Sequence, residues 1–343
     1  MTSNIAAQGL DTRRLGTLRR MSRLADPGGF LLVAAIDHPE NYLALFDADI
    51  SRVPHETVVA SKLELVAMMA RHASALLLDP VWSLGQAVLT GDLPGSAGLI
   101  APIERLVYAP GTRLGWELDV RPRPGWGVEK IAAVGADGAK FLVFHRAELT
   151  EVAAAQRELV AELAAACHAH GLPLIVEPLW YPLDGEDPAD ERVARAREEA
   201  IVAAAATFAD AGADVLKVQF PGRIGTAGDR ASAHAAARDL DAALRVPWVL
   251  LSEGAGYDDF VVQMDICARA GASGYIAGRA VWGDAVGRLP DAERRAAVIR
   301  AGQRLAALND IVRAHGRPAI ERLPTAQATA ALPPKWYENS RYG

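Results

Sequence analysis

The sequence contains few cysteines and no long uninterrupted run of apolar residues. Its two cysteines, Cys167 and Cys267, exclude a disulfide framework and a cysteine-rich zinc module. Asp, Arg, Gly or Pro interrupts the apolar runs every few residues, so no run is long enough to cross a membrane. No apolar stretch of the signal-peptide type follows the arginines near the N-terminus, and we therefore expect a soluble cytoplasmic protein.

A surplus of basic residues, which nucleic-acid-binding proteins usually carry, is also missing. The 42 Asp and Glu residues outnumber the 36 Lys and Arg residues, and the formal net charge is −6. Apolar residues make up 51% of the chain of 343 residues, which provides for a large core and excludes general disorder. We expect a folded protein that binds neither nucleic acid nor membranes.

Lysine is scarce as well, whereas 31 residues are arginine. Arginine keeps its proton in proteins and cannot act as an amine nucleophile. Each remaining lysine is therefore a candidate for a special role. The five positions are Lys62, Lys130, Lys140, Lys217 and Lys335.

Eight short apolar runs alternate with helical segments along the chain. The runs are continuously apolar, which indicates strands that are buried on both faces of a parallel sheet. Ala-rich amphipathic stretches such as 149–170 and 191–211 separate them, and several end in glycine, a common helix C-cap. The eight runs are residues 31–36, 75–78, 98–103, 139–144, 172–176, 213–220, 248–251 and 274–277.

Eight strand–helix units in about 250 residues predict an α/β fold of the (β/α)8 TIM-barrel type, over residues 31–284. Residues 1–30 contain a helix, expected over 11–25, that would close the barrel as an N-terminal cap. Residues 285–343 contain a C-terminal helix, expected over 291–314, and a Pro-rich tail. An open doubly wound sheet is the rival fold, but no glycine-rich fingerprint follows the first strand.

In a TIM barrel the active site lies at the carboxyl ends of the strands. Two of the five lysines, Lys140 and Lys217, lie inside the apolar runs near these ends. The helix-facing side of a strand is dry, so an unpaired ammonium is accommodated better toward the barrel mouth. The polar residues expected at this mouth are Asp37, Asp79, Glu104, Lys140, Glu177, Lys217, Ser252 and Arg279.

Two lysines at one mouth repel each other, so one of them can lose its proton near neutral pH. A neutral amine attacks a ketone and forms a Schiff base, whose iminium stabilises a carbanion on the neighbouring carbon. Glu177, on the strand between the two lysines, can then shuttle protons. The alternative is that each lysine is a structural partner of an acidic residue, and the convergence of Lys140, Lys217 and Glu177 favours catalysis.

The loops after the last two predicted strands carry a second signal. Ser252-Glu253-Gly254 and Gly278-Arg279 combine small residues with a hydroxyl group and an arginine. Loops at this position commonly bind phosphate in TIM barrels through backbone N–H groups. Each loop alone is weak evidence, because glycines also end strands for ordinary turn geometry. Together they predict a phosphate site.

Seven segments, in order along the chain, carry a family resemblance: AAIDH at 34–38, LLLDP at 76–80, GAKFLVF at 138–144, IVEPLWY at 175–181, DVLKVQFP at 214–221, LLSEG at 250–254 and AGRAVW at 277–282. They resemble the class I, Schiff-base tagatose-1,6-bisphosphate aldolases and their relatives, including the sulfofructose-phosphate aldolases. The resemblance implies that Lys217 forms the Schiff base and that Glu177 acts as acid and base. It also implies that Lys140 and Asp37 contact the hydroxyls and the carbonyl region of a substrate.

The same resemblance implies a cradle for the 1-phosphate of a ketose, which becomes the phosphate of dihydroxyacetone phosphate. Its residues are Ser252, Gly254, Gly278 and Arg279. The pair Asp37-His38 is similar to the Asp-His of archaeal-type class I aldolases and their synthase relatives, which adds His38 as a binding candidate. No metal or other cofactor is expected, because the iminium replaces a Lewis acid. The family also suggests a homo-oligomer.

One segment departs from the family pattern. Where the family has Asp-Gln-Arg-Gly, this chain has Asp-His-Pro-Glu at 37–40. An arginine that could meet a second phosphate or sulfonate is missing, and the acidic Glu40 is present, which predicts an aldehyde fragment of lower charge. Alternatively, another arginine supplies this contact, and the candidates are Arg113, Arg121, Arg123 and Arg223.

The sequence therefore favours a class I aldolase that cleaves or forms a ketose 1-phosphate. A transaldolase-like synthase that uses the same iminium, and a non-catalytic barrel that binds a sugar phosphate, are the alternatives. A zinc-dependent aldolase needs convergent histidines, and the strand ends offer only His38 and His145. His168 and His170 lie two apart at a helix end, so they face different ways and are expected to be exposed.

Overall fold

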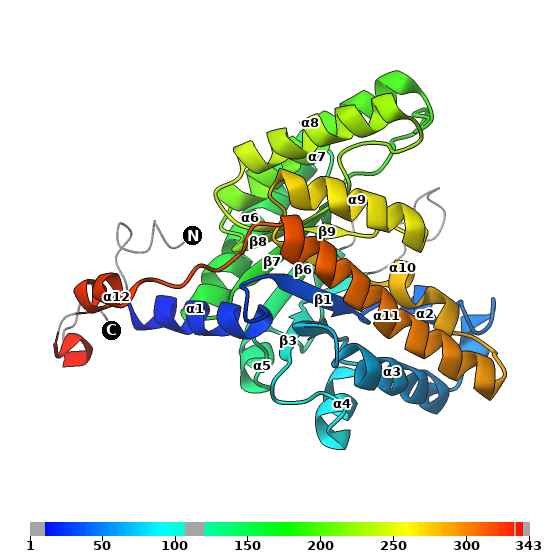
Figure 1. Ribbon diagram of the computed structural model, residues 1–343, viewed down its shortest axis with the longest axis horizontal. Coiled ribbons are helices and arrows are strands. Elements are labelled where there is room, and N and C mark those ends of the chain that lie inside the picture. Colours follow the sequence, from blue (N-terminus) through cyan, green and yellow to red (C-terminus); the bar gives the residue numbers. More distant parts are fainter. Residues whose placement is uncertain (1–10, 107–119, 333, 339–343) are drawn as a thin grey trace.

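The computed structural model describes residues 11–106, 120–332 and 334–338. Eight parallel strands form a closed barrel in the order β1-β10-β9-β8-β7-β6-β3-β2, with helices around it (Figure 1). The predicted TIM barrel is therefore confirmed. Its strands are β1 (Leu31–Ala35), β2 (Ala75–Leu77), β3 (Gly98–Pro102), β6 (Gly138–Phe144), β7 (Leu174–Leu179), β8 (Val215–Val218), β9 (Trp248–Leu251) and β10 (Gly274–Ala277).

Long helices follow most of the strands and pack their apolar faces against the outside of the barrel. Short helices and 3-10 turns are found in the loops. The helices are α1 (Thr12–Leu24), α2 (Glu40–Leu43), α3 (His55–Met69), α4 (Leu84–Thr90), α5 (Val128–Ala133), α6 (Thr150–Ala169), α7 (Glu191–Asp210), α8 (Ala227–Ala243), α9 (Tyr257–Ala270), α10 (Arg279–Trp282), α11 (Asp291–His315) and α12 (Thr325–Ala331).

The amino-terminal end of the barrel is filled by α1. Met21 and Leu24 belong to the same buried cluster as the inward-facing side chains of seven of the strands. Two glycines at the start of β3 and β6 make room for Leu24. A Cβ on Gly98 would lie 2.6 Å from the carbonyl oxygen of Arg23, and one on Gly138 would lie 3.0 Å from Leu24 Cδ1.

The alternation of side chains along each strand determines which residues reach the mouth. Ile175 and Val215 point into the interior cluster. Residues two positions later point the same way, because side chains alternate between the two faces of a strand. This places Glu177 and Lys217 inside the barrel, one layer closer to its carboxyl end.

The structure differs from the prediction at several elements. An antiparallel hairpin, β4 (Glu104–Leu106) with β5 (Val120–Pro122), follows β3 and was not predicted. Helix α8 begins five residues before the predicted 232, because the Thr226 and Asp229 side chains form a capping box there. Strand β7 continues to Leu179, three residues beyond its predicted end. The helices α2, α4 and α12 were also missed.

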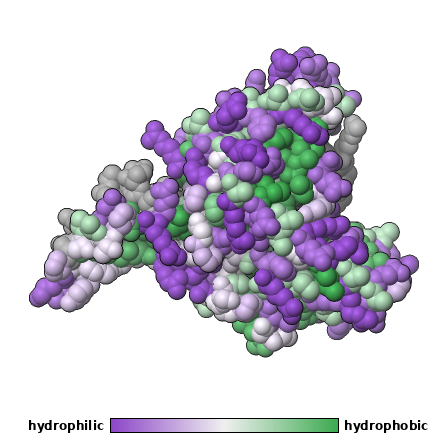
Figure 2. Space-filling model, viewed as in Figure 1, coloured by the Kyte–Doolittle hydropathy of each residue, from purple (hydrophilic) through white to green (hydrophobic). Residues whose placement is uncertain are grey.

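The outer surface shown in Figure 2 is largely hydrophilic, with an apolar area next to α9. The segment that carries α12 extends away from the barrel (Figure 1), and α12 has no buried residue. Among the described residues, no helix combines the length and the apolar character that crossing a membrane requires.

Candidate active site

A cavity of about 480 Å³ occupies the carboxyl end of the barrel. All nine residues that the sequence analysis assigned to catalysis or substrate binding line it. The structure therefore brings together residues from β6, β7 and β8 and from the loops after β1, β9 and β10. These residues are Asp37, His38, Lys140, Glu177, Lys217, Ser252, Gly254, Gly278 and Arg279.

Lys140, Glu177 and Lys217 form a continuous row on the neighbouring strands β6, β7 and β8. Glu177 lies between the two lysines, with its Oε1 2.8 Å from Lys217 Nζ and its Oε2 2.7 Å from Lys140 Nζ. None of the three residues is more than 7% exposed. The amino groups of both lysines therefore share one buried carboxylate at the floor of the cavity.

Lys140 is surrounded by carboxylates. Its Nζ lies 2.5 Å from Glu104 Oε1 and 3.6 Å from Asp37 Oδ2, in addition to its contact with Glu177. Burial alone would lower the pKa of Lys140, but the three carboxylates outweigh burial and raise this pKa. Lys140 therefore stays protonated at neutral pH and serves as a fixed hydrogen-bond donor.

The carboxylates of this cluster differ in how strongly they hold a proton. Burial would raise the pKa of Glu177, but Lys140 and Lys217 outweigh burial and lower it. Burial would likewise raise the pKa of Asp37, and Lys140 with the other nearby cations again lowers it. For Glu104, burial prevails over Lys140, and its pKa is raised. Glu177 and Asp37 therefore hold a proton less tightly than Glu104 does.

The predicted phosphate cradle lies on the side of the barrel across from β6. Ser252 and Gly254 follow β9, and Gly278 and Arg279 follow β10. Gly254 has a φ of +75°, in the region that favours glycine. Arg279 is exposed, and its guanidinium forms no ion pair within the described part of the chain. Backbone amides and a free guanidinium at one place suit an anionic group.

His38 completes this side of the cavity. A Cβ at Gly278 would lie 2.5 Å from His38 Cε1, so the glycine is what allows the ring to pack there. The ring also meets Trp282 edge-on, with 5.3 Å between centroids. Burial lowers the pKa of His38 to about 4, and Lys217 and Arg279 contribute although Asp37 opposes them. His38 is therefore neutral at pH 7.

Gln219 is a cavity residue that the sequence analysis did not identify. Its side-chain oxygen accepts a hydrogen bond from Trp180 N at 2.6 Å, and its Nε2 donates to Trp180 O at 3.2 Å and to Glu253. Gln219 thereby connects the loops after β7, β8 and β9. Because Gln219 lies two residues after Lys217, the alternation of side chains could have indicated that it points into the barrel. The sequence could not have indicated its hydrogen-bond partners.

Of the three arginines within the described residues that were considered for a second anionic group, Arg123, directly after β5, lines the cavity. In the described ranges its guanidinium has no ion-pair partner. Glu40 is exposed and does not line the cavity, so the part of the sequence argument that rests on this acidic residue is wrong, whereas Pro39, at the position of the family's arginine, does line the cavity. Arg223 lies beside Asp229 and Arg121 is exposed on β5, while Arg113 falls outside the described residues.

Two other polar residues at strand ends have structural partners. Asp79 lines the cavity, but its carboxylate accepts hydrogen bonds from Lys62 and Ser83. His145 packs edge-on against Phe208 of α7, with 5.0 Å between ring centroids, and so lies on the outside of the barrel, away from His38.

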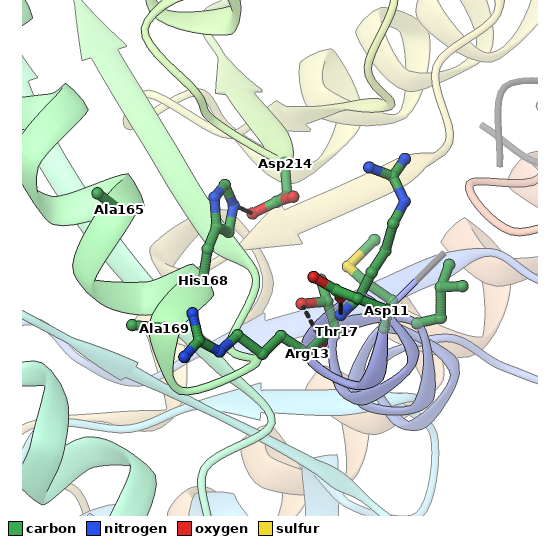
Figure 3. A pocket seen from close by; sticks show the side chains of 10 residues that line it. Asp11, Arg13, Thr17, Ala165, His168, Ala169 and Asp214 are labelled. Carbon is green, nitrogen blue, oxygen red and sulfur yellow. Dashed lines mark hydrogen bonds and ion pairs between the residues drawn. The ribbon is translucent and has the colours of Figure 1, made fainter. Parts of the chain in front are cut away.

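A second cavity, of about 390 Å³, lies at the opposite end of the barrel between α1 and α6 (Figure 3). His168 borders it and is hydrogen-bonded to Asp214 at 2.9 Å, which raises the pKa of the histidine. His168 is therefore partly buried and paired, rather than freely exposed as expected. Arg13 and Thr17 line the side formed by α1, and no lysine is present. Active sites of TIM barrels lie at the carboxyl ends of the strands, which is the opposite end of the barrel from this second cavity.

Comparisons with known proteins identify the family of this chain. Residues 33–284 match the DeoC/LacD family aldolase. The chain belongs to this family. It is 27% identical to the tagatose 1,6-diphosphate aldolase of Streptococcus agalactiae over 285 residues, which cover 78% of this chain and 85% of that protein. It is 28% identical to the tagatose 1,6-diphosphate aldolase of Lactococcus lactis over 288 residues, with the same two shares.

The fold of this DeoC/LacD family aldolase is similar to that of a solved Schiff-base-forming fructose-1,6-bisphosphate aldolase. The TM-score is 0.58 at 18% sequence identity, and the match covers 86% of this chain and 99% of the other. An aldolase is a carbon–carbon lyase, and its site has to stabilise a carbanion beside a carbonyl group. In this DeoC/LacD family aldolase, the row of Lys140, Glu177 and Lys217 lies at the carboxyl end of the barrel, where TIM barrels carry their active sites.

Proposed function

We propose that the protein is a class I aldolase that cleaves or forms a ketose 1-phosphate through a Schiff base on Lys217. The products of cleavage are dihydroxyacetone phosphate, or a close analogue, and an aldehyde. The observation that carries this proposal is the buried Lys217, 2.8 Å from Glu177, at the floor of a cavity at the carboxyl end of the barrel. An amine and a base in hydrogen-bond contact meet the geometric requirement for nucleophilic catalysis.

Imine formation begins with a proton transfer within this pair. Lys217 gives a proton to Glu177, and the neutral amine adds to the C2 carbonyl of the ketose. The resulting carbinolamine loses water, with the proton supplied by Glu177, and becomes an iminium. Lys140 stays protonated throughout, so it holds Glu177 in place and donates to a substrate oxygen.

Cleavage uses the iminium as the electron acceptor. A base removes the proton of the C4 hydroxyl, the C3–C4 bond breaks, and its electron pair forms an enamine while the aldehyde leaves. Glu177 and Asp37 are the ionised carboxylates available for this proton transfer. The enamine is then protonated at C3, and water hydrolyses the new iminium to release dihydroxyacetone phosphate and restore Lys217.

The phosphate of the substrate is assigned to the loops after β9 and β10. Arg279 and the backbone amides near Ser252, Gly254 and Gly278 support this assignment, because charge-assisted hydrogen bonds favour a doubly charged anion. Neutral His38 lies beside this cradle and can donate or accept a hydrogen bond without repelling Arg279.

Borohydride trapping tests the proposal. Incubation with dihydroxyacetone phosphate or a panel of ketose phosphates, followed by reduction, should leave a stable secondary amine on Lys217 that mass spectrometry locates. The Lys217→Ala variant should form no adduct. Wild-type protein without an adduct would refute the Schiff-base mechanism and leave a sugar-phosphate-binding barrel. Release of free dihydroxyacetone phosphate would distinguish cleavage from transfer of the fragment to a second aldehyde.

A further inference from the structure

Lys62 is a third buried lysine at the carboxyl end of the barrel, and the reaction proposed above does not use it. It lies on α3, and its side chain is 0% exposed. Its Nζ donates to Asp79 Oδ2 at 2.5 Å, to the Ile36 carbonyl at 2.9 Å and to the His38 carbonyl at 3.0 Å. These three bonds use all three N–H donors of the ammonium group.

The two carbonyl groups that Lys62 holds are those on either side of Asp37. Strand β1 ends at Ala35, so the carbonyls of residues 36 and 38 lie beyond the regular ladder and need other donors. Lys62 supplies both. It fixes the backbone on each side of Asp37, whose carboxylate lies 3.6 Å from Lys140, and it fixes His38 where the ring meets Gly278.

A purely stabilising ion pair is the competing explanation. Asp79 does not need Lys62 for its other contacts, since it also accepts hydrogen bonds from Val81 N, Trp82 N and Ser83 Oγ. Buried ion pairs are poor stabilisers compared with well-packed apolar side chains of similar volume. Stability alone therefore gives little reason for a lysine here, whereas two backbone carbonyls at a predicted substrate-binding turn require a donor of this length.

We propose that Lys62 is a positioning residue of the aldolase site, which holds the turn at 36–38 so that Asp37 faces Lys140 and His38 faces the phosphate cradle. This inference rests on the proposed Schiff-base function of Lys217. It assigns no contact with substrate to Lys62 itself. Loss of the two carbonyl contacts would move Asp37 and slow the proton transfers of the reaction, while leaving the nucleophile in place.

The test separates positioning from stability with matched variants. Lys62→Met leaves Asp79 as an uncompensated buried charge and is expected to be unstable. The double variant Lys62→Met/Asp79→Asn removes both charges but keeps an acceptor for the amides of Val81 and Trp82. Asp79→Asn alone removes the counter-ion of Lys62 but keeps both carbonyl contacts, because even a neutral amine has two N–H donors for the Ile36 and His38 carbonyls. Lys130→Met, at an exposed lysine on α5, is the control for loss of a lysine charge.

The readout is deuterium exchange into dihydroxyacetone phosphate in D2O, which follows enamine formation and does not require the aldehyde to be known. In the double variant the exchange rate constant should fall about 10- to 100-fold, because a shift of the order of 1 Å in a catalytic group has this effect. The half-saturating concentration should rise by a smaller factor than the rate constant falls, since Lys62 supports the cradle only through His38, whereas Arg279 and the backbone amides stay in place. Borohydride should still trap Lys217, and Asp79→Asn should exchange within about threefold of wild type.

Each outcome distinguishes this inference from the function on which it rests. A wild-type protein that neither exchanges nor is trapped refutes the Schiff-base proposal itself. A double variant with wild-type thermal stability and wild-type exchange shows that Lys62 only offsets the charge of Asp79, and overturns the inference. If the double variant does not fold, Asp79→Asn decides the matter, because a loss of tenfold or more in that variant would also overturn it.

Discussion

Replacing Glu177 by glutamine is the most direct perturbation of the proposed chemistry. The amide keeps the shape of the side chain but removes the negative charge that lies 2.8 Å from Lys217 and 2.7 Å from Lys140. Lys217 then has no base in contact to take its proton, and the two ammonium groups repel each other. The repulsion by itself favours the neutral amine, but the missing base leaves no group in contact to take the proton of Lys217 or to return it when the carbinolamine loses water, and we expect this loss to dominate.

The expected loss can be estimated from what a positioned acid–base group contributes. General acid–base catalysis is worth about 10²- to 10⁴-fold. At about 1.4 kcal/mol per factor of ten, this corresponds to about 3–5 kcal/mol of transition-state stabilisation. We therefore expect Glu177→Gln to lower the rate constant for retro-aldol cleavage by this factor and to slow borohydride trapping of Lys217 in parallel.

Glu104→Gln is the matched control for this experiment. Glu104 is as buried as Glu177 and lies 2.5 Å from Lys140, but no contact with Lys217 is found among the described residues. Its substitution should disturb the charge balance of the cluster and lower the rate by less than about tenfold. Equal losses in the two variants would refute the reasoning, because they would show that net charge, and not contact with the nucleophile, sets the rate.

Three further predictions follow from the cavity. Arg279→Ala should raise KM for 1-phosphorylated ketoses about 10- to 100-fold, from the loss of a charge-assisted hydrogen bond worth about 1.5–3 kcal/mol, and should leave KM for unphosphorylated ketoses unchanged. Arg123→Ala should raise KM for a 1,6-bisphosphate more than for a 1-phosphate, and equal effects would exclude Arg123 from binding a second anionic group. The lowered pKa of His38, about 4 against 6.5, means that the unfolded chain binds the proton first as the pH falls, so the protein loses about 2 kcal/mol of stability between pH 7 and pH 5. Chemical denaturation of His38→Gln should show a correspondingly smaller loss over that range.

The sequence predicts the barrel and the row of charged residues for the same physical reason. Buried parallel strands leave continuous apolar runs, and any charged residue within a run has to point to the one polar place available, the mouth. Val215 and Lys217, two apart on β8, illustrate this, because the first joins the interior core and the second reaches the cavity. The convergence of Lys140, Glu177 and Lys217 follows from the neighbouring positions of their strands.

Other parts of the site depend on contacts that no local pattern encodes. Arg123 reaches the cavity because a hairpin follows β3, and its strands are too short and too polar to be recognised in the sequence. Lys62 reaches the turn at 36–38 from a helix, and its direction depends on how α3 packs against the barrel. Glu40 was misjudged for a similar reason, since its place in the sequence beside His38 does not place it in the cavity.

The shared carboxylate explains how a buried site can tolerate the charge changes of Schiff-base chemistry. In the resting cluster, the positive group beside Glu177 is the ammonium of Lys217. In the proposed intermediate it is the iminium nitrogen, which occupies nearly the same position and carries the same charge. At 2.8 Å and an effective dielectric constant of about 20, the gross attraction to Glu177 is about 6 kcal/mol in either state.

The pairing that stabilises the free lysine is therefore ready for the iminium, and the surrounding groups need not reorganise when it forms. That attraction is lost only in the step between these two states, when Lys217 is a neutral amine and Glu177 carries the proton. Lys140 limits this cost, because its own contacts with Glu104 and Asp37 persist while Glu177 carries the proton. The net charge of the cavity is therefore the same in the resting site and in the proposed iminium. A single buried lysine–carboxylate pair would also keep its charge constant, but it would lack the second cation, Lys140, that holds the base in place.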